Sequence, residues 1–189
     1  MITSSPHEVV GTLSSEIDRV EADLDCRSVP AISYTFSVEK GVVKPDRFTE
    51  LVGAPDVDLD ELVDAGQRIL GSMGKKALYG LLLSDDTCAP VTSWHPDQHD
   101  VLTAASVLPL KVLGGEVNSF SKNDILHAVD QGTAQEIFDG ELEAGAAVYL
   151  RPNTLHASPS HRDIVRAIAD QTRANSRRTV FKLYGMRSD

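Results

Sequence analysis

The sequence has few of the residues and runs on which several specialised protein classes depend. Cysteine occurs only twice, as Cys26 and Cys88, which is too few for a disulfide framework. Neither cysteine has a metal-binding partner at the spacing of a zinc site. No apolar run approaches the roughly 18 residues that a membrane span requires, and the N-terminus lacks the charged-then-apolar pattern of a secretion signal. We therefore expect a reduced, cytoplasmic protein without a membrane partner.

Basic residues are also in the minority, with 18 Lys and Arg against 28 Asp and Glu, so the formal net charge is −10. This charge argues against non-specific binding to nucleic acid or to anionic membranes. The stretch at 71–74 (GSMG) lacks the rest of a phosphate-binding P-loop, and no G-x-S-x-G nucleophile motif occurs. We expect a small-molecule substrate and no nucleic acid partner, while the oligomeric state stays open.

The length of 189 residues is typical of one domain, and we expect residues 1–189 to form a single domain. Residues 7–25 carry apolar side chains at helical spacing and predict an amphipathic helix. Residues 31–38 have the composition of a strand, and residues 58–72 predict a second helix. Residues 1–73 are therefore expected to form a helical N-terminal extension with one strand, packed on the outside of a sheet.

After Gly74 the pattern changes to short apolar runs that are separated by turn residues. Runs of this length and spacing are typical of a β-sandwich or barrel. The expected strands are 76–83, 101–108, 110–113, 116–120, 135–138, 146–150 and 179–184. The sequence thus predicts a mainly β fold with flanking helices, whose core is formed by residues 74–189.

The residues best suited to chemistry are a His-x-Asp pair, His95 and Asp97, and a distant histidine, His156. On an extended segment, residues two positions apart point to the same side, so His95 and Asp97 can reach one metal ion. Two histidines and one carboxylate on one face of an octahedral ion are the ligands of non-heme Fe(II) oxygenases. His156 follows the expected strand 146–150 and a proline-containing turn, a suitable position for the third ligand. The remaining histidines are expected at the surface.

The region from about 76 to 184 resembles the double-stranded β-helix core of the Fe(II)/2-oxoglutarate-dependent oxygenases. In that family a His-x-Asp motif leads into one strand and a distal histidine ends a later strand. Here His156 lies 59 positions after Asp97. The resemblance implies a jelly-roll, cupin-like fold in which His95, Asp97 and His156 are the catalytic Fe(II) ligands. It also implies 2-oxoglutarate as cosubstrate and hydroxylation of a small molecule or amino acid, with formation of succinate and CO2.

Subfamilies differ in the basic residue that holds the distal carboxylate of 2-oxoglutarate. Arg166, within HASPSHRDIVRAI, resembles the anchor of phytanoyl-CoA-hydroxylase-like members, and the GGE at 114–116 resembles a glycine pair of prolyl-hydroxylase-like members. Thr92 and Lys111 instead match two cosubstrate positions of Jumonji-type members. We favour Arg166 as the anchor, because a strand through residues 164–168 would turn it into the barrel. That strand is expected although the same residues have helical propensity.

Two other functions stay open. A metal-dependent cupin enzyme that does not use 2-oxoglutarate would share the barrel and a GAAVYLRPNTLHAS-like second motif. Its first motif normally includes a glutamate, which has no well-placed counterpart after the cluster His95–His99. A non-catalytic β-sandwich binding protein would have histidines without a metal. The substrate is expected to contact segments outside the motifs, such as 39–57 and 120–134, and the sequence does not identify it.

Overall fold

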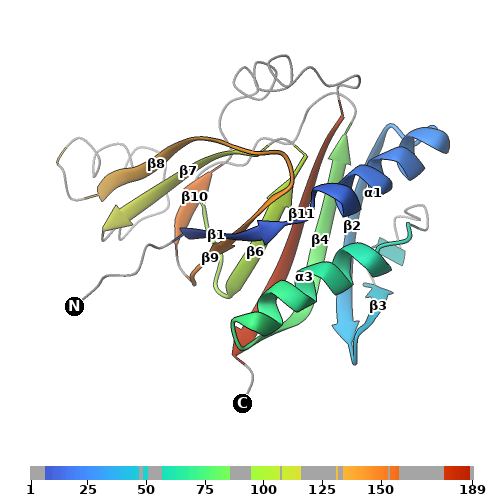
Figure 1. Ribbon diagram of the computed structural model, residues 1–189, viewed down its shortest axis with the longest axis horizontal. Coiled ribbons are helices and arrows are strands. Elements are labelled where there is room, and N and C mark those ends of the chain that lie inside the picture. Colours follow the sequence, from blue (N-terminus) through green and yellow to red (C-terminus); the bar gives the residue numbers. More distant parts are fainter. Residues whose placement is uncertain are drawn as a thin grey trace.

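The computed structural model describes residues 7–46, 49–50, 57–85, 95–106, 108–115, 131, 134–152, 154–157 and 177–187. The described chain forms two antiparallel sheets and two helices (Figure 1). The seven-stranded sheet has the order β1 (His7–Thr12), β9 (Ala146–Leu150), β6 (Asp100–Ala105), β11 (Arg178–Arg187), β4 (Lys75–Asp85), β2 (Ala31–Glu39) and β3 (Val42–Pro45). The four-stranded sheet has the order β5 (His95–Pro96), β10 (Leu155–Ala157), β7 (Leu108–Gly115) and β8 (Ala134–Leu142).

The connectivity of the strands is that of a jelly roll. From β4 onward the chain passes between the two sheets, with β4 in the larger sheet, β5 in the smaller, β6 in the larger and β7 in the smaller. After the antiparallel pair β7 and β8, the chain continues with β9 in the larger sheet, β10 in the smaller and β11 in the larger. This alternation is expected of a double-stranded β-helix. The predicted fold class, mainly β with flanking helices, is therefore confirmed.

Helices α1 (Ser14–Cys26) and α3 (Asp60–Ser72) cover one face of the larger sheet (Figure 1). Their apolar side chains bury surface against alternate residues of the strands, which gives the main core of the molecule. This core includes Leu13, Ile17, Leu24, Leu62, Leu70, Phe36, Leu102, Phe181 and Leu183. The helix α3 approaches the sheet closely at Gly66, where a Cβ atom would lie 2.5 Å from Cδ1 of Leu183. A larger residue at this position would therefore force the side chain of Leu183 or the helix α3 to shift.

The opposite face of the larger sheet is turned toward the smaller sheet. Successive residues of a strand point to opposite faces, so β11 directs Phe181 and Leu183 to the helices and Val180 and Lys182 to the other side. A second apolar cluster on that side consists of Val101, Ala105, Val148, Leu150 and Val180. The side chain of Lys182 reaches residues of β5 and β10. Polar side chains of both sheets therefore contact one another in the space between the sheets.

The helix expected over residues 7–25 is wrong in its first part. Residues His7–Thr12 form β1, which pairs with β9, and the helix begins only at Ser14. Since β9 pairs with β6 on its other side, β1 satisfies backbone groups that would otherwise form an open sheet edge. The β-branched residues Val9 and Val10 suit a strand as well as a helical stripe. The long-range pairing therefore decides the conformation of this segment.

The other expected elements are confirmed where the structure describes them. The strand expected at 31–38 is β2, the helix expected at 58–72 is α3, and the later apolar runs in the described ranges fall in β4, β6, β7, β8, β9 and β11. The run expected as one strand at 101–108 is divided, since β6 ends at Ala105 and β7 begins at Leu108, and the short strands β5 and β10 were not expected. The strands expected at 116–120 and at 164–168 lie outside the described residues. No helix in the described ranges is long and apolar enough to cross a membrane.

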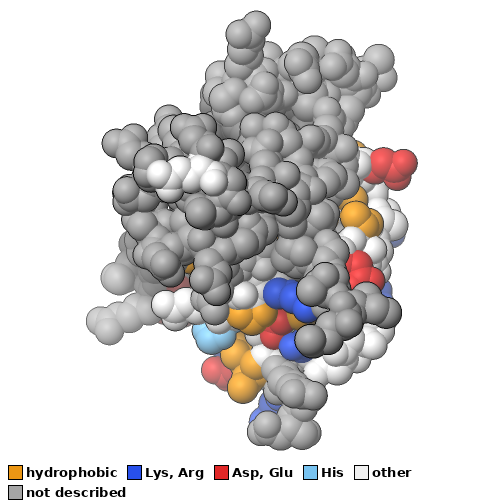
Figure 2. Space-filling model, turned by 90° about the vertical axis from the view of Figure 1, so that its left-hand side faces the viewer, with side chains coloured by type: hydrophobic (Ala, Val, Ile, Leu, Met, Phe, Trp, Pro, Cys, Tyr) orange, Lys and Arg blue, Asp and Glu red, His pale blue; other side chains and the backbone are white. Residues whose placement is uncertain are grey.

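The described surface carries side chains of mixed character. Figure 2 shows hydrophobic, basic, acidic and histidine side chains next to one another on the left-hand face of the molecule, where its side chains are described. The exposed large apolar residues in the described ranges belong to different strands and are Val9, Val42, Tyr79 and Met186. Single exposed apolar residues are normal for a protein surface. Of these four, Tyr79 also lines a cavity of about 560 Å³.

Candidate metal centre

The strands β5 and β10 bring the two predicted histidine ligands opposite each other. In their antiparallel pairing, His95 is the direct partner of His156, and the centroids of the two rings lie 4.3 Å apart. Asp97 follows His95 by two positions, so its side chain turns to the same side. One ligand atom of each residue lies within 4.8 Å of the other two. The structure thus brings the three expected ligands together, and their binding of a metal stays a prediction.

The ring of His156 is held by the backbone just before β10. Its Nδ1 lies 2.9 Å from the carbonyl oxygen of Thr154, and because a carbonyl oxygen can only accept, Nδ1 donates this hydrogen bond. The other nitrogen, Nε2, therefore faces the site and lies 3.3 Å from Oδ2 of Asp97. The side chain of His156 is buried. Metal-binding histidines are commonly oriented by such a carbonyl partner.

A lysine outside the predicted ligand set also reaches these three residues. Lys182, on β11, is buried, and its Nζ lies 3.3 Å from Nε2 of His95, 3.3 Å from Oδ2 of Asp97 and 3.5 Å from Nε2 of His156. The sequence carries one signal for it. In the run TVFKLY at 179–184, a charged residue stands among apolar ones in an expected strand. Such a lysine requires accepting or anionic partners when it is buried.

The surroundings of Asp97 keep its carboxyl group ionised. Burial acts to raise the pKa of Asp97, but the contact with His156 and the positive charge of Lys182 outweigh burial and lower the pKa from 3.8 to about 2. Burial raises the pKa of Tyr184, and the charge of Asp97 raises it further. The pKa of Tyr79 is raised by the same two causes. At neutral pH the site therefore contains a carboxylate beside two neutral phenols.

The three donor atoms fit a divalent metal ion. Two imidazole nitrogens and one carboxylate oxygen form the donor set of the 2-His-1-carboxylate type. The positively charged Nζ of Lys182 lies within 3.5 Å of all three donor atoms, so these atoms converge on a point that favours a cation. An ion held from one side by three protein ligands would keep positions open for other molecules.

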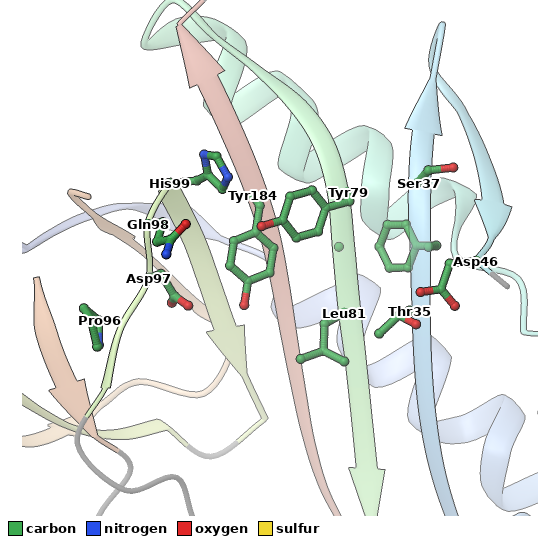
Figure 3. Close-up of a pocket in the computed structure, with 12 residues that line it drawn as sticks. Thr35, Ser37, Asp46, Tyr79, Leu81, Pro96, Asp97, Gln98, His99 and Tyr184 are labelled. Atoms are coloured by element: carbon green, nitrogen blue, oxygen red, sulfur yellow. The ribbon is translucent and has the colours of Figure 1, made fainter. Parts of the chain in front are cut away.

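A cavity of about 560 Å³ adjoins this cluster through Asp97. The rings of Tyr79 and Tyr184 stack in its centre, with centroids 4.5 Å apart and an angle of 12° between the planes. In Figure 3, Asp97 lies on one side of the stacked rings, whereas Thr35 and Asp46 lie on the other side. The side chains project from β2, β4 and β11 on the face of the sheet away from the helices (Figure 3). A cavity of this size accommodates a small molecule.

Two further residues define the polar rim of the cavity. His99 is exposed, as expected, and its ring stands edge-on to Tyr79 with a centroid distance of 6.0 Å. Asp46 accepts a hydrogen bond of 2.8 Å from the backbone N–H of Thr49, which fixes its carboxylate at the end of β3. Neither the tyrosine pair nor Asp46 was singled out by the sequence. The only signal for Tyr79 and Tyr184 is that each lies in an apolar run, because their contact depends on the pairing of β4 with β11.

The proposed cosubstrate residues are described only in part. Arg166 and Thr92 lie outside the described residues, and so does the strand expected through 164–168. Lys111 lies in β7, where the structure describes only the backbone, and pairs with Ala157. The strand that follows β10 in the described chain is β11. The anchor of the cosubstrate therefore stays a prediction.

The chain is similar to a number of solved structures at low sequence identity, among them the following three. The similarity to iron-bound HygX from Streptomyces hygroscopicus has a TM-score of 0.44 at 12% identity and covers 96% of this chain and 82% of that one. For AviO1 from Streptomyces viridochromogenes Tue57, the TM-score is 0.45 at 10% identity, with 91% and 82% covered. For the ribosomal oxygenase YcfD from Escherichia coli, in complex with cobalt and 2-oxoglutarate, it is 0.40 at 15% identity, with 89% and 44% covered.

This chain therefore spans less than half the length of the ribosomal oxygenase and about four-fifths of the two Streptomyces proteins. No protein-family model matches the chain, and no curated protein sequence matches it.

Proposed function

We propose that this protein is an Fe(II)- and 2-oxoglutarate-dependent oxygenase that hydroxylates a small molecule. The observation that carries the proposal is the convergence of His95, Asp97 and His156, whose ligand atoms lie within 4.8 Å of one another beside a cavity. A metal ion with open positions requires adjoining space for the molecules that react there. The cluster and the cavity together therefore support an enzyme better than a binding protein with incidental histidines.

The side chains of the cluster have distinct tasks in this proposal. His95, Asp97 and His156 would hold the iron. When bound, the iron and 2-oxoglutarate supply the oxidation of a C–H bond by O2, with release of succinate and CO2. Asp97 has a pKa of about 2, so at neutral pH it offers a negative charge without first losing a proton. The carbonyl of Thr154 keeps Nε2 of His156 turned inward, and the burial of the ring excludes water from that side.

The distal carboxylate of 2-oxoglutarate requires a cationic partner, and an arginine can bind it through two hydrogen bonds. We propose Arg166 for this role on the basis of the family resemblance of HASPSHRDIVRAI. Lys111 is the rival anchor and Thr92 a further cosubstrate contact, both on the basis of the Jumonji-type resemblance. Measuring 2-oxoglutarate binding distinguishes Arg166 from Lys111, because only one of these two basic residues is expected to bind the distal carboxylate.

The cavity supports a small-molecule substrate. The stacked rings of Tyr79 and Tyr184 offer an aromatic floor, and the polar groups of Thr35 and Asp46 lie at the far end from Asp97. A molecule on this floor would have one end beside the metal ligands and the other end beside hydrogen-bonding groups. Aromatic surfaces with a few polar groups are typical of small-molecule sites.

Anaerobic titration of the visible absorbance band of iron-bound 2-oxoglutarate tests the cosubstrate and its anchor. The wild type is expected to develop the band in the presence of Fe(II). Loss of a salt bridge to a buried carboxylate costs roughly 2–5 kcal/mol, so Arg166→Ala should weaken 2-oxoglutarate binding more than tenfold. Lys111→Ala should weaken it much less.

The reverse ranking of the two variants would move the anchor to β7 and retain the reaction class. A wild type that binds Fe(II) but shows no band would contradict the use of 2-oxoglutarate and favour a metal-dependent cupin enzyme. A wild type that binds no metal would favour a non-catalytic binding protein.

A further inference from the structure

Lys182 contacts the three donor atoms that would bind a metal ion. Its Nζ lies 3.3 Å from the ligand atoms of His95 and Asp97 and 3.5 Å from Nε2 of His156. An ammonium group has only N–H donors, so it is stabilised here by the lone pairs of these three atoms. The same lone pairs would bind the metal. Lys182 and a metal ion therefore compete for one set of donor atoms.

The charges lead to the same conclusion. Bonds from such ligands to a metal are about 2.0–2.2 Å long, so an ion on Oδ2 of Asp97 would lie at most about 5.5 Å from Nζ of Lys182. Only 10% of the Lys182 side chain and 15% of the Asp97 side chain are exposed, so water screens the repulsion weakly. A divalent ion and an ammonium group at this separation repel each other. The ammonium group must therefore leave the three donor atoms when an ion binds.

In the metal-free protein, Lys182 is instead stabilising. A carboxylate that is shielded from water and lacks a positive partner strongly destabilises a folded protein. Lys182 provides the positive charge next to Asp97, and the two histidine nitrogens accept its remaining hydrogen bonds. The metal-free centre is thus already charge-compensated by a residue of the chain.

We propose that Lys182 is a built-in counter-ion of the metal centre, which occupies the position of the metal in the metal-free protein and is displaced when the metal binds. This inference rests on the proposed function only in that it requires the triad to bind a metal. Its consequence is that the site binds metal more weakly than the three ligands alone would. Removal of Lys182 should therefore tighten metal binding and weaken the metal-free fold.

Titration with Co(II), without any 2-oxoglutarate, tests this inference through the visible absorbance of the metal. Lys182→Met removes the charge and the donors, while Lys182→Gln retains an amide donor and is the variant to use if the methionine variant does not fold. Both should bind Co(II) at least tenfold more tightly than the wild type, a difference of about 1.4 kcal/mol. The matched control is Lys75→Met. Lys75 also pairs with a carboxylate, that of Asp100 at 2.8 Å, but belongs to no metal ligand set, so this variant should retain the wild-type affinity.

Thermal unfolding gives a second measurement on the same proteins. The metal-free Lys182 variants should melt below the wild type, and Co(II) should raise their melting temperature by more than it raises that of the wild type.

Weaker Co(II) binding by the Lys182 variants would make Lys182 a ligand or a positioning residue and overturn the inference. Unchanged affinity would overturn it as well. If neither the wild type nor the variants bind Co(II), the metal centre of the proposed function fails together with the inference. If the wild type binds Co(II) and the variants bind no more tightly, only the inference fails.

Discussion

Among the single residues of the site, Asp97 interacts with each of its other parts. Its carboxylate contacts His156 and Lys182 at 3.3 Å each, contributes to the raised pKa of Tyr184 and borders the cavity. Burial alone would raise the pKa of Asp97, and its contacts with His156 and with the positively charged Lys182 lower it to about 2. The negative charge of the cluster is therefore present before any metal binds.

This shift predicts an acid-sensitive contribution to the stability of the metal-free protein. Because the pKa of Asp97 falls from 3.8 to about 2 on folding, its stabilisation is complete above about pH 4 and is lost as the pH falls toward 2. One pKa unit corresponds to about 1.4 kcal/mol, so the loss is at most roughly 2–3 kcal/mol. The free energy of unfolding of the Asp97→Asn variant, measured by urea denaturation in the presence of a chelator, should depend less on pH in this window.

The matched control for this prediction is Asp58→Asn. Asp58 is an exposed carboxylate that accepts a hydrogen bond from the backbone N–H of Asp60, and asparagine can accept the same bond. The control should retain the pH dependence of the wild type. Equal pH dependence in Asp97→Asn and wild type would refute the charge assignment.

Single residues also show the limit of prediction from sequence. The convergence of His95, Asp97 and His156 was predictable because a His-x-Asp motif and a later histidine carry a recognisable order. The position of Lys182 beside these residues was not predictable. It lies 26 positions after His156, and the sequence shows only that it belongs to an expected strand. Which of its neighbours face the site depends on how β11 is placed between β4 and β6. That placement results from backbone pairing over long sequence distances, which local patterns do not encode.

At the scale of elements, the packing of α3 on β11 is tightest at a glycine. Gly66 is buried, and a Cβ atom there would lie 2.5 Å from Cδ1 of Leu183 and 3.4 Å from Cε1 of Phe181. Gly71 lies in the same helix, but a Cβ atom there would meet nothing within 4 Å. The two glycines therefore differ in packing while sharing a helical backbone.

This difference predicts opposite effects of the same substitution. Gly66→Ala should destabilise the protein by about 1–3 kcal/mol, because the core must shift to admit the methyl group. Gly71→Ala should stabilise it by up to about 1 kcal/mol, because alanine favours the helix. Urea denaturation of both variants checks the pair, and a Gly66→Ala variant as stable as Gly71→Ala would contradict the close approach of α3 to the sheet.

The elements differ in how well local sequence predicts them. The helix α3 is close to its expected range because its apolar stripe and its tertiary contacts agree. The first residues of the expected N-terminal helix form β1 instead, because residues such as Val9, which pairs with Val148, find an available strand edge in β9. Periodicity describes which residues of a segment can be buried. It does not say whether a strand elsewhere in the chain offers a partner.

For the whole molecule, the jelly roll explains why distant residues share one site. The proposed ligands Asp97 and His156 are 59 positions apart in the sequence. The pairing of β5 with β10 in the smaller sheet places His156 opposite His95, two residues before Asp97. The larger sheet contributes Lys182 and the tyrosine pair from its inner face. The proposed centre therefore exists only when both sheets are assembled.

The iron content of protein reconstituted anaerobically with Fe(II) tests the proposed metal centre. We expect one Fe(II) per chain for the wild type and loss of that iron in His156→Ala. His99→Ala, which removes an exposed imidazole outside the ligand set, should retain it. Full iron occupancy in the His156→Ala variant would contradict the metal centre described here.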